Sequence, residues 1–208
     1  MKSIIKFLIF AGLTVLFCST NVIAQNNMND DKKMEMMMMD NMKSWPEASR
    51  MAAKEMTEKY GKPNEMTENA MVWYNNGPWM KTIVYKKEVA HNFLVTHQDV
   101  MQQFLSYKVD PSKFDELAAF DGSVVVDRTR GELSARCDKE ANNMLALNLS
   151  YDVIMGKKSV EEAREFYGKT IIMVMKGEKP AYTQKLNFSS EENAEFHDMN
   201  LDKMMMNK

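Results

Sequence analysis

The chain has 208 residues, of which 27 are lysine or arginine and 29 are aspartate or glutamate, so its formal net charge is −2. A nucleic-acid-binding protein is expected to carry a strongly basic face, and this mild acidity argues against that class of partner. The sequence between the two polar ends of the chain is long enough for about one domain.

The first residues have the pattern of a secretory signal peptide. Lys2 and Lys6 precede an apolar run over residues 7–17, and the tripeptide ending at Ala24 supplies the small-residue site that signal peptidase requires. We therefore expect residues 1–24 to be removed and the mature protein to be exported, either to a bacterial periplasm or out of the cell. The apolar run is too short for a permanent span, so no membrane association is expected after cleavage.

Two polar, methionine-rich segments flank the rest of the sequence. Residues 25–43 and 189–208 contain few aliphatic or aromatic side chains besides methionine, so they cannot bury enough surface to offset chain entropy. We expect both to be disordered, the first as a tether and the second as a tail. A single domain is then predicted over residues 44–188.

The first predicted elements of this domain are a helix and a β-hairpin. The tetrapeptide Ser44-Trp45-Pro46-Glu47 has the composition of a capping box, and the helix that follows it is expected to end at Gly61. Aromatic and β-branched runs at residues 70–74 and 79–87 flank Asn75-Asn76-Gly77-Pro78, which is typical of a hairpin turn.

Strands and helices alternate in the second half of the domain. Residues 104–109 predict a strand, residues 111–120 a short helix and residues 123–127 another strand. A capping box that begins at Thr129 predicts one long helix over 129–155, and another at Ser159 predicts a last helix to about residue 176. The predicted fold is α+β, with a small antiparallel sheet packed by helices.

The methionine clusters at the two ends are the first candidate functional feature. Thioether sulfur is a soft, neutral ligand that favours Cu(I), and by extension Ag(I), over hard ions. Two alternatives remain open: the methionines are apolar filler in an unstructured segment, or they are a reversible sink for oxidants. The candidate soft-metal ligands are Met34, Met36, Met37, Met38, Met39, Met42, His197, Met204, Met205 and Met206.

His91, His97 and Asp99 are the second candidate. If residues 90–99 are extended, odd-numbered side chains share one face, which places both imidazoles and the carboxylate together. Such a set is a partial site for zinc or a similar ion. The alternative is that these histidines are only hydrogen-bonded, because three residues in one segment are not a specific metal signature.

Arg128, Arg130 and Arg136 are the third candidate. The first two flank the first residue of the predicted long helix, where free backbone N–H groups and the helix dipole favour an anion. Two guanidiniums there could clamp a carboxylate or a phosphate. The alternative is that Arg136 pairs with Glu132 and Glu140 at i,i+4 spacing on a solvated helix face.

Cys137 is the only cysteine of the mature chain, which excludes an intramolecular disulfide. It falls on the apolar face of the predicted long helix, where a free cysteine usually behaves as a small buried hydrophobe. The alternative is a nucleophile that uses His91 or His97 as its base.

Several short sequence patterns stand out in the predicted domain. They are YGKP at Tyr60–Pro63, NGPW at Asn76–Trp79, the stretch from Phe120 to Glu140 and EAREFY at Glu162–Tyr167. Together they resemble a family of secreted bacterial proteins without an established activity. The resemblance implies export and a single domain, and it implies a proline-bearing segment between the two histidines, where this chain has Phe93-Leu94-Val95-Thr96.

The sequence thus favours binding over catalysis, with soft-metal capture by the two ends as its most concrete mechanism. The alternative is a domain that binds a small anionic ligand through Arg128 and Arg130, or a hydrolase-like enzyme that adds His91 or His97. Neither the ligand nor the oligomeric state is indicated by the sequence.

Overall fold

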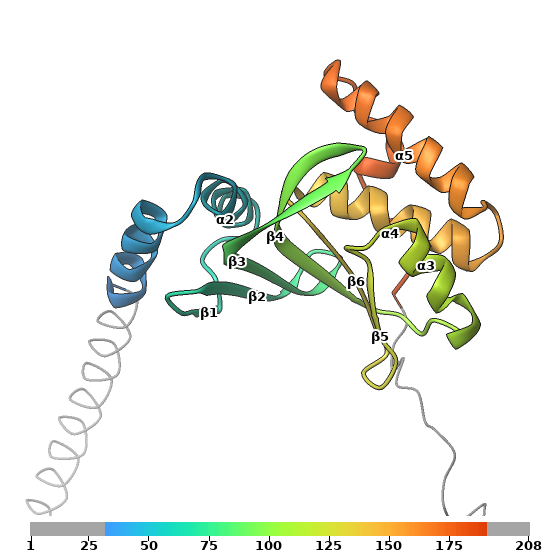
Figure 1. Cartoon of the computed structure of the whole chain (residues 1–208). Coiled ribbons are helices and arrows are strands. Elements are labelled where there is room, and N and C mark those ends of the chain that lie inside the picture. Colours follow the sequence, from blue (N-terminus) through green and yellow to red (C-terminus); the bar gives the residue numbers. More distant parts are fainter. Residues whose placement is uncertain (1–31, 191–208) are drawn as a thin grey trace, which may run out of the picture. The chain divides into compact units, whose positions relative to one another are not determined.

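The computed structural model describes residues 32–190, and Figure 1 shows it coloured along the sequence. The chain divides into two compact units, Met1–Ser44 and Trp45–Lys208, and each is described by itself. The predicted signal peptide and residues 191–208 of the predicted tail lie outside the described residues.

Residues 32–44 of the first unit form a helix. This corrects the expectation that the whole of residues 25–43 is disordered, although residues 25–31 lie outside the described part of the chain. Methionine, lysine and glutamate all have high helix propensity, so this segment can be helical without the apolar surface that a folded domain requires. The composition of this segment indicates that it has no hydrophobic core of its own, but it does not exclude a helix.

An antiparallel sheet forms the centre of the second unit and confirms the predicted α+β fold (Figure 1). Its strands are β1 (Glu65–Met66), β2 (Ala70–Asn76), β3 (Trp79–Phe93), β4 (Val95–Ser106), β5 (Val125–Asp127) and β6 (Glu132–Cys137). The order across the sheet is β1-β2-β3-β4-β6-β5. The β2–β3 hairpin turns at the predicted Asn-Gly-Pro sequence, since Asn76 and Trp79 are its last register partners.

Helices cover one face of this sheet. They are α2 (Glu47–Tyr60), α3 (Phe114–Phe120), α4 (Glu140–Ile154) and α5 (Val160–Met175), with short 3₁₀ turns at Pro111–Lys113 and Ala181–Thr183. Gln103 of β4 shows the arrangement, because its Nε2 lies 3.8 Å from Met56 Sδ of α2 and 3.3 Å from Glu140 Oε1 of α4. Helix α5 packs on α4 and α3.

The capping predictions had different outcomes. The box at Ser159 is confirmed: its hydroxyl accepts from the Glu162 backbone N–H, and the Glu162 carboxylate accepts from the Ser159 N–H. The box that begins at Ser44 is wrong, because no side chain of the preceding residues caps α2. The carboxylate of Glu88 on β3 accepts from the Ala48 N–H instead, at 3.1 Å.

The prediction of one long helix over residues 129–155 is wrong in its first part. Strands β5 and β6 form a hairpin there, with its turn at residues 128–131, and α4 starts only afterwards. Leu133, Ala135 and Cys137 alternate along β6 and are buried where β6 pairs with β4. Leu133 and Cys137, four residues apart, also fit helical spacing, and the pairing with β4 makes this segment a strand.

Helix α4 is buried on all sides. Leu145, Ala146, Leu147, Asn148 and Leu149 follow one another without an exposed position. The cause is the location of α4, which contacts β4 and β6, the helices α3 and α5, and the 3₁₀ turn after α5. A helix that is apolar around its whole circumference is characteristic of such an interior position.

Candidate metal centre

The β3–β4 hairpin brings two of the predicted ligands together. His91 of β3 and His97 of β4 are register partners, with ring centroids 5.0 Å apart. Leu94 forms the turn between them with a φ of 57°. In one extended segment over residues 90–99, as predicted, a six-residue separation would place the two side chains about 20 Å apart. The grouping is therefore confirmed, but its cause is the turn and not the extended segment.

Asp99 lies between the two imidazoles. Its Oδ2 is 3.4 Å from His91 Nδ1, and its Oδ1 is 3.3 Å from His97 Nε2. One donor atom from each of the three residues lies within 4.8 Å of the others. The aspartate is buried, whereas both histidines are partly accessible.

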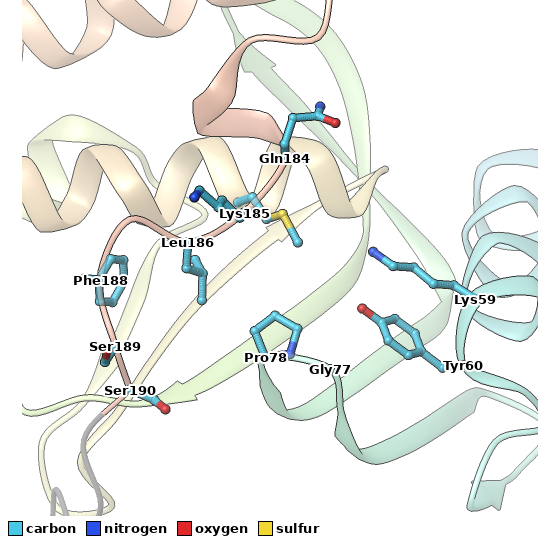
Figure 2. A pocket seen from close by; sticks show the side chains of 11 residues that line it. Lys59, Tyr60, Gly77, Pro78, Gln184, Lys185, Leu186, Phe188, Ser189 and Ser190 are labelled. Carbon is cyan, nitrogen blue, oxygen red and sulfur yellow. The ribbon is translucent and has the colours of Figure 1, made fainter.

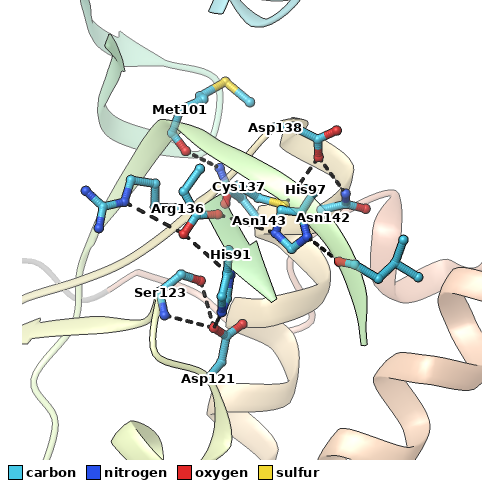
Figure 3. A network of polar contacts seen from close by, with 12 residues as sticks. His91, His97, Met101, Asp121, Ser123, Arg136, Cys137, Asp138, Asn142 and Asn143 are labelled. Carbon is cyan, nitrogen blue, oxygen red and sulfur yellow. Dashed lines mark hydrogen bonds and ion pairs between the residues drawn. The ribbon is translucent and has the colours of Figure 1, made fainter. Parts of the chain in front are cut away.

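A second carboxylate approaches His91 from the segment after α3 (Figure 3). Asp121 Oδ1 is 3.7 Å from His91 Nε2, and it accepts hydrogen bonds of 2.8 Å from both the backbone N–H and the hydroxyl of Ser123. His91 thus has one carboxylate at each ring nitrogen. A carboxylate behind a histidine, held in turn by hydrogen bonds, is typical of residues that orient a metal-binding imidazole.

Three buried atoms at this site make no hydrogen bond. They are Asp99 Oδ1, His91 Nδ1 and Arg136 Nε, the last lying 4.0 Å from Asp99 Oδ2. Buried polar atoms are almost always hydrogen-bonded in folded proteins, because an unpaired one costs free energy. Two of these atoms belong to the predicted ligand set, where they contact other members of the set at ion-pair distance and not as well-directed hydrogen bonds.

The electrostatics of His97 follow from its neighbours. The Asp99 carboxylate 3.3 Å away, and then Cys137, raise the pKa of His97 to about 11 despite the opposing effect of burial. Its Nδ1–H donates to the carbonyl of Val95 at 2.8 Å, which leaves Nε2 directed at Asp99. A metal ion that uses Nε2 has to displace a proton from this ring.

Cys137 lies beside the histidines, but it does not have the properties of a nucleophile. It is only 3% exposed, and burial raises the pKa of its thiol. Its Sγ–H donates to Asp138 Oδ1 at 3.3 Å. The expectation of a small buried side chain is confirmed, although it occupies a strand and not the predicted helix.

The structure separates the three predicted arginines. Arg128 and Arg130 lie in the β5–β6 turn and not at a helix start, which removes the premise of an anion site there. The Arg130 guanidinium pairs with the Asp127 carboxylate at 3.6 Å. The Arg130 backbone N–H donates a hydrogen bond to the same carboxylate at 3.0 Å. Arg136 is on β6, next to the histidine cluster.

The predicted thioether ligands fall partly within the described residues. Met34, Met38 and Met42 are half-buried on helix 32–44, at successive i,i+4 positions. Three further methionines of that helix are mostly exposed: Met36, Met37 and Met39. The ligands of the other end lie outside the described residues, and they are His197, Met204, Met205 and Met206.

Sequence reasoning missed Asp121 and Ser123. Asp121 and Gly122 fall between the helix predicted over residues 111–120 and the strand predicted over residues 123–127, and the structure has a turn there, closed by the Val124 N–H to Asp121 carbonyl bond. Nothing local distinguishes this aspartate from any other turn aspartate. Its burial, at 2% exposed, and its approach to His91 both depend on the docking of distant segments.

Comparison with models of protein families, with curated proteins and with solved structures finds no match for this chain. Among residues 32–190, no helix is both long enough and apolar enough to cross a membrane.

Proposed function

We propose that this protein is an exported metal-ion-binding protein with a site at His91, His97 and Asp99. The observation that carries the proposal is the position of Asp99, whose two oxygens each face a nitrogen of a different imidazole, at 3.4 Å and 3.3 Å. In a tetrahedral site with metal–ligand bonds of about 2.0–2.1 Å, neighbouring ligand atoms lie about 3.3 Å apart. The two measured distances involve different oxygens of Asp99, and one donor atom from each residue lies within 4.8 Å of the others, so a small movement of the side chains lets all three hold one ion.

The donor set favours a borderline divalent ion such as Zn²⁺ or Cu²⁺. Neutral imidazole nitrogens and a carboxylate oxygen are common ligands of both ions, whereas Ca²⁺ and Mg²⁺ prefer oxygen alone. Once an ion has displaced the proton of His97, the charges of Asp99 and Asp121 outweigh the single positive charge of Arg136. That balance supports a cation at the centre of the cluster.

An ion-pair network without metal is the competing explanation. In that case a protonated His91 bridges Asp99 and Asp121, and a protonated His97 pairs with Asp99, at the same distances. Asp99 Oδ1 and His91 Nδ1 lie at ion-pair distance from their partners, 3.3 Å and 3.4 Å, without forming well-directed hydrogen bonds, and the metal titration below separates the two explanations.

Soft-ion capture by the methionines is a second proposed activity. One observation supports it: helix 32–44 aligns Met34, Met38 and Met42 on one side, where Cβ atoms four residues apart lie about 5–6 Å from one another. Long, flexible thioether side chains on such a stripe can converge on one Cu(I) or Ag(I) ion. This site is separate from the histidine cluster.

The deciding experiment is a competition titration of the full mature chain at neutral pH with Zn²⁺ and with Cu²⁺. The test variant is Asp99→Asn, which keeps the size of the side chain and removes its charge, and the matched control is Asp115→Asn on the exposed side of α3. We expect Asp99→Asn to lose at least about 100-fold in affinity, because even outer residues of metal sites contribute about 10–100-fold. Asp115→Asn should bind as the unaltered chain does.

Equal affinity of the unaltered chain and Asp99→Asn, or no binding by either, would refute the histidine site. The stripe formed by Met34, Met38 and Met42 is tested separately. The experiment is an anaerobic Cu(I) titration of a variant in which all three methionines are replaced by leucine. Leucine conserves the volume and removes the sulfur, so retained Cu(I) affinity would exclude the stripe.

A further inference from the structure

A pocket of about 610 Å³ lies between the end of α2, the β2–β3 turn, the start of α4 and the segment after the last 3₁₀ turn (Figure 2). This volume is within the range of sites that hold small organic molecules, about 300–1,000 Å³. None of its lining residues belongs to the histidine site.

The wall on the α2 side is held by a buried carboxylate. Glu140 Oε1 accepts from the Tyr60 hydroxyl at 2.6 Å and from Trp79 Nε1 at 2.5 Å, and its Oε2 accepts from the Lys59 ammonium. Gly77 allows Tyr60 to lie here, since a Cβ at Gly77 would be 2.8 Å from the tyrosine oxygen. Lys59 and Tyr60 therefore have defined positions, and Figure 2 shows both directed into the space.

The opposite wall is held by a single asparagine of α4. Asn148 Nδ2 donates to the carbonyls of Tyr182 and Lys185 at 2.9 Å and 2.8 Å, and its Oδ1 accepts from the Asn187 N–H at 2.7 Å. Phe188, at the end of this segment, stacks on Tyr151 of α4 with ring centroids 4.6 Å apart. Both walls are thus formed before any ligand binds, which lowers the entropic cost of binding.

The lining combines apolar surface with positive charge. Pro78, Met144, Leu186 and Phe188 supply the apolar part. Lys59 and Lys185 carry the charges, and among the described residues that line the pocket there is no aspartate or glutamate. An ammonium has three donor hydrogens, so Lys59 keeps donors for a ligand while it contacts Glu140.

We propose that this pocket binds an amphipathic anion, a molecule with an apolar body and one carboxylate group. The apolar body lies against Leu186, Phe188 and Met144, and the carboxylate lies at the ammonium group of Lys59, while Lys185 adds positive charge on the opposite wall. The proposal is independent of metal binding at the histidines. It differs from the anion site suggested by the sequence, which used Arg128 and Arg130, because neither arginine lines this pocket.

The test is calorimetric titration of the full mature chain, at low salt, with four probes: decanoate, decanol, decyltrimethylammonium and acetate. We expect decanoate to bind at least about ten-fold more tightly than each of the other three, because only decanoate has both the apolar body and the negative charge. Equal affinity for decanol or decyltrimethylammonium would refute recognition of the charge. Equal affinity for acetate would refute the apolar part, and absence of decanoate binding would refute the pocket.

Lysine variants locate the site. Lys185→Gln changes an exposed side chain and leaves the Glu140 contacts intact, so it should fold normally and lose about five-fold to ten-fold in decanoate affinity. Lys59→Gln should lose more, although it also removes a partner of Glu140. The matched control is Lys169→Gln, which breaks an exposed pair with Glu165 on α5 and should not change decanoate affinity. Decanoate affinity unchanged in Lys185→Gln and Lys59→Gln would place the binding elsewhere.

Discussion

His91 and His97 face each other across the β3–β4 hairpin as register partners, with their ring planes inclined at 61°. Because Leu94 lies midway between them, each histidine is three residues from the turn, and both side chains point to the same side of the ribbon. The site therefore depends on where the hairpin turns: a one-residue shift of the register would turn one imidazole to the opposite face.

Ser123 is expected to affect metal affinity without touching the ion. Its hydroxyl donates to Asp121 Oδ1, which lies behind His91. The Ser123→Ala variant should lose about ten-fold in Zn²⁺ affinity, since residues that orient a ligand contribute about 10–100-fold. Competition titration measures this effect, with Ser112→Ala, at an exposed position before α3, as the matched control. Equal losses in both variants would contradict a positioning role for Ser123.

Glu140 is expected to be important for stability. Its removal in Glu140→Ala leaves the buried Trp79 Nε1 without its acceptor and removes one of two oxygen acceptors of Gln103 Nε2, and we expect the free energy of unfolding to fall by about 3 kcal/mol. Urea denaturation measures the change. Glu116→Ala breaks only a partly exposed pair with Lys113 and should cost less than about 1 kcal/mol. A Glu140→Ala variant as stable as the control would show that the buried contacts are energetically replaceable.

Glu55 is expected to make stability depend on pH. Burial, and then the negative charge of Glu140, raise the pKa of Glu55 above its usual 4.5. The folded state therefore disfavours the ionised form, which destabilises the protein at neutral pH, and this cost disappears as the pH falls through the raised pKa to below 4.5.

The Glu55→Gln variant removes that ionisation. It should be more stable than the unaltered chain at pH 7 and equally stable below pH 4.5, as measured by urea denaturation at both values. Glu58→Gln, at an exposed position of the same helix, provides the control and should show no such gain. A constant difference at both pH values would exclude ionisation of Glu55 as the cause.

Two glycines should respond to alanine in opposite directions. At Gly168 on α5, a Cβ would meet only the Leu94 side chain at ordinary contact distance, 3.7 Å, so Gly168→Ala should stabilise the helix by about 0.5–1 kcal/mol. At Gly77, φ is +66° and the Cβ would press on the Tyr60 oxygen, so Gly77→Ala should destabilise by more than about 1 kcal/mol. Melting curves of the two variants check the signs, and a stable Gly77→Ala variant would contradict the close packing of Tyr60.

Local signals predicted some of the elements well. The capping box at Ser159 and the turn near Gly77 act through residues adjacent in sequence, and both are confirmed. Only residues 104–106 of the strand predicted at 104–109 belong to β4, Val95–Ser106, which begins earlier than predicted because it pairs with β3, and residues 107–109 are not strand. The helix over 129–155 failed for a related reason, since β6 is a strand only because β4 is beside it.

The candidate site also contains residues that the sequence could predict and one that it could not. His91, His97 and Asp99 are candidates because odd-numbered side chains share a face of an extended segment, whereas the turn at Leu94, which was not predicted, is what brings them together. Asp121 is 22 or more residues away from all of them, and no periodicity connects it to His91. Its contribution follows from the packing of α3 and the loop after it, which only a three-dimensional structure contains.

The enclosed position of α4 has a consequence for how the domain opens. The sheet, α5 and the C-terminal segment each cover a different part of α4. Detachment of any one of them therefore leaves the rest of the helix covered. We therefore expect the backbone amides of Leu145, Leu147 and Leu149 to exchange with solvent only through unfolding of the whole domain, at one common rate. Helix α2, which covers the sheet from one side, is free to exchange through smaller openings.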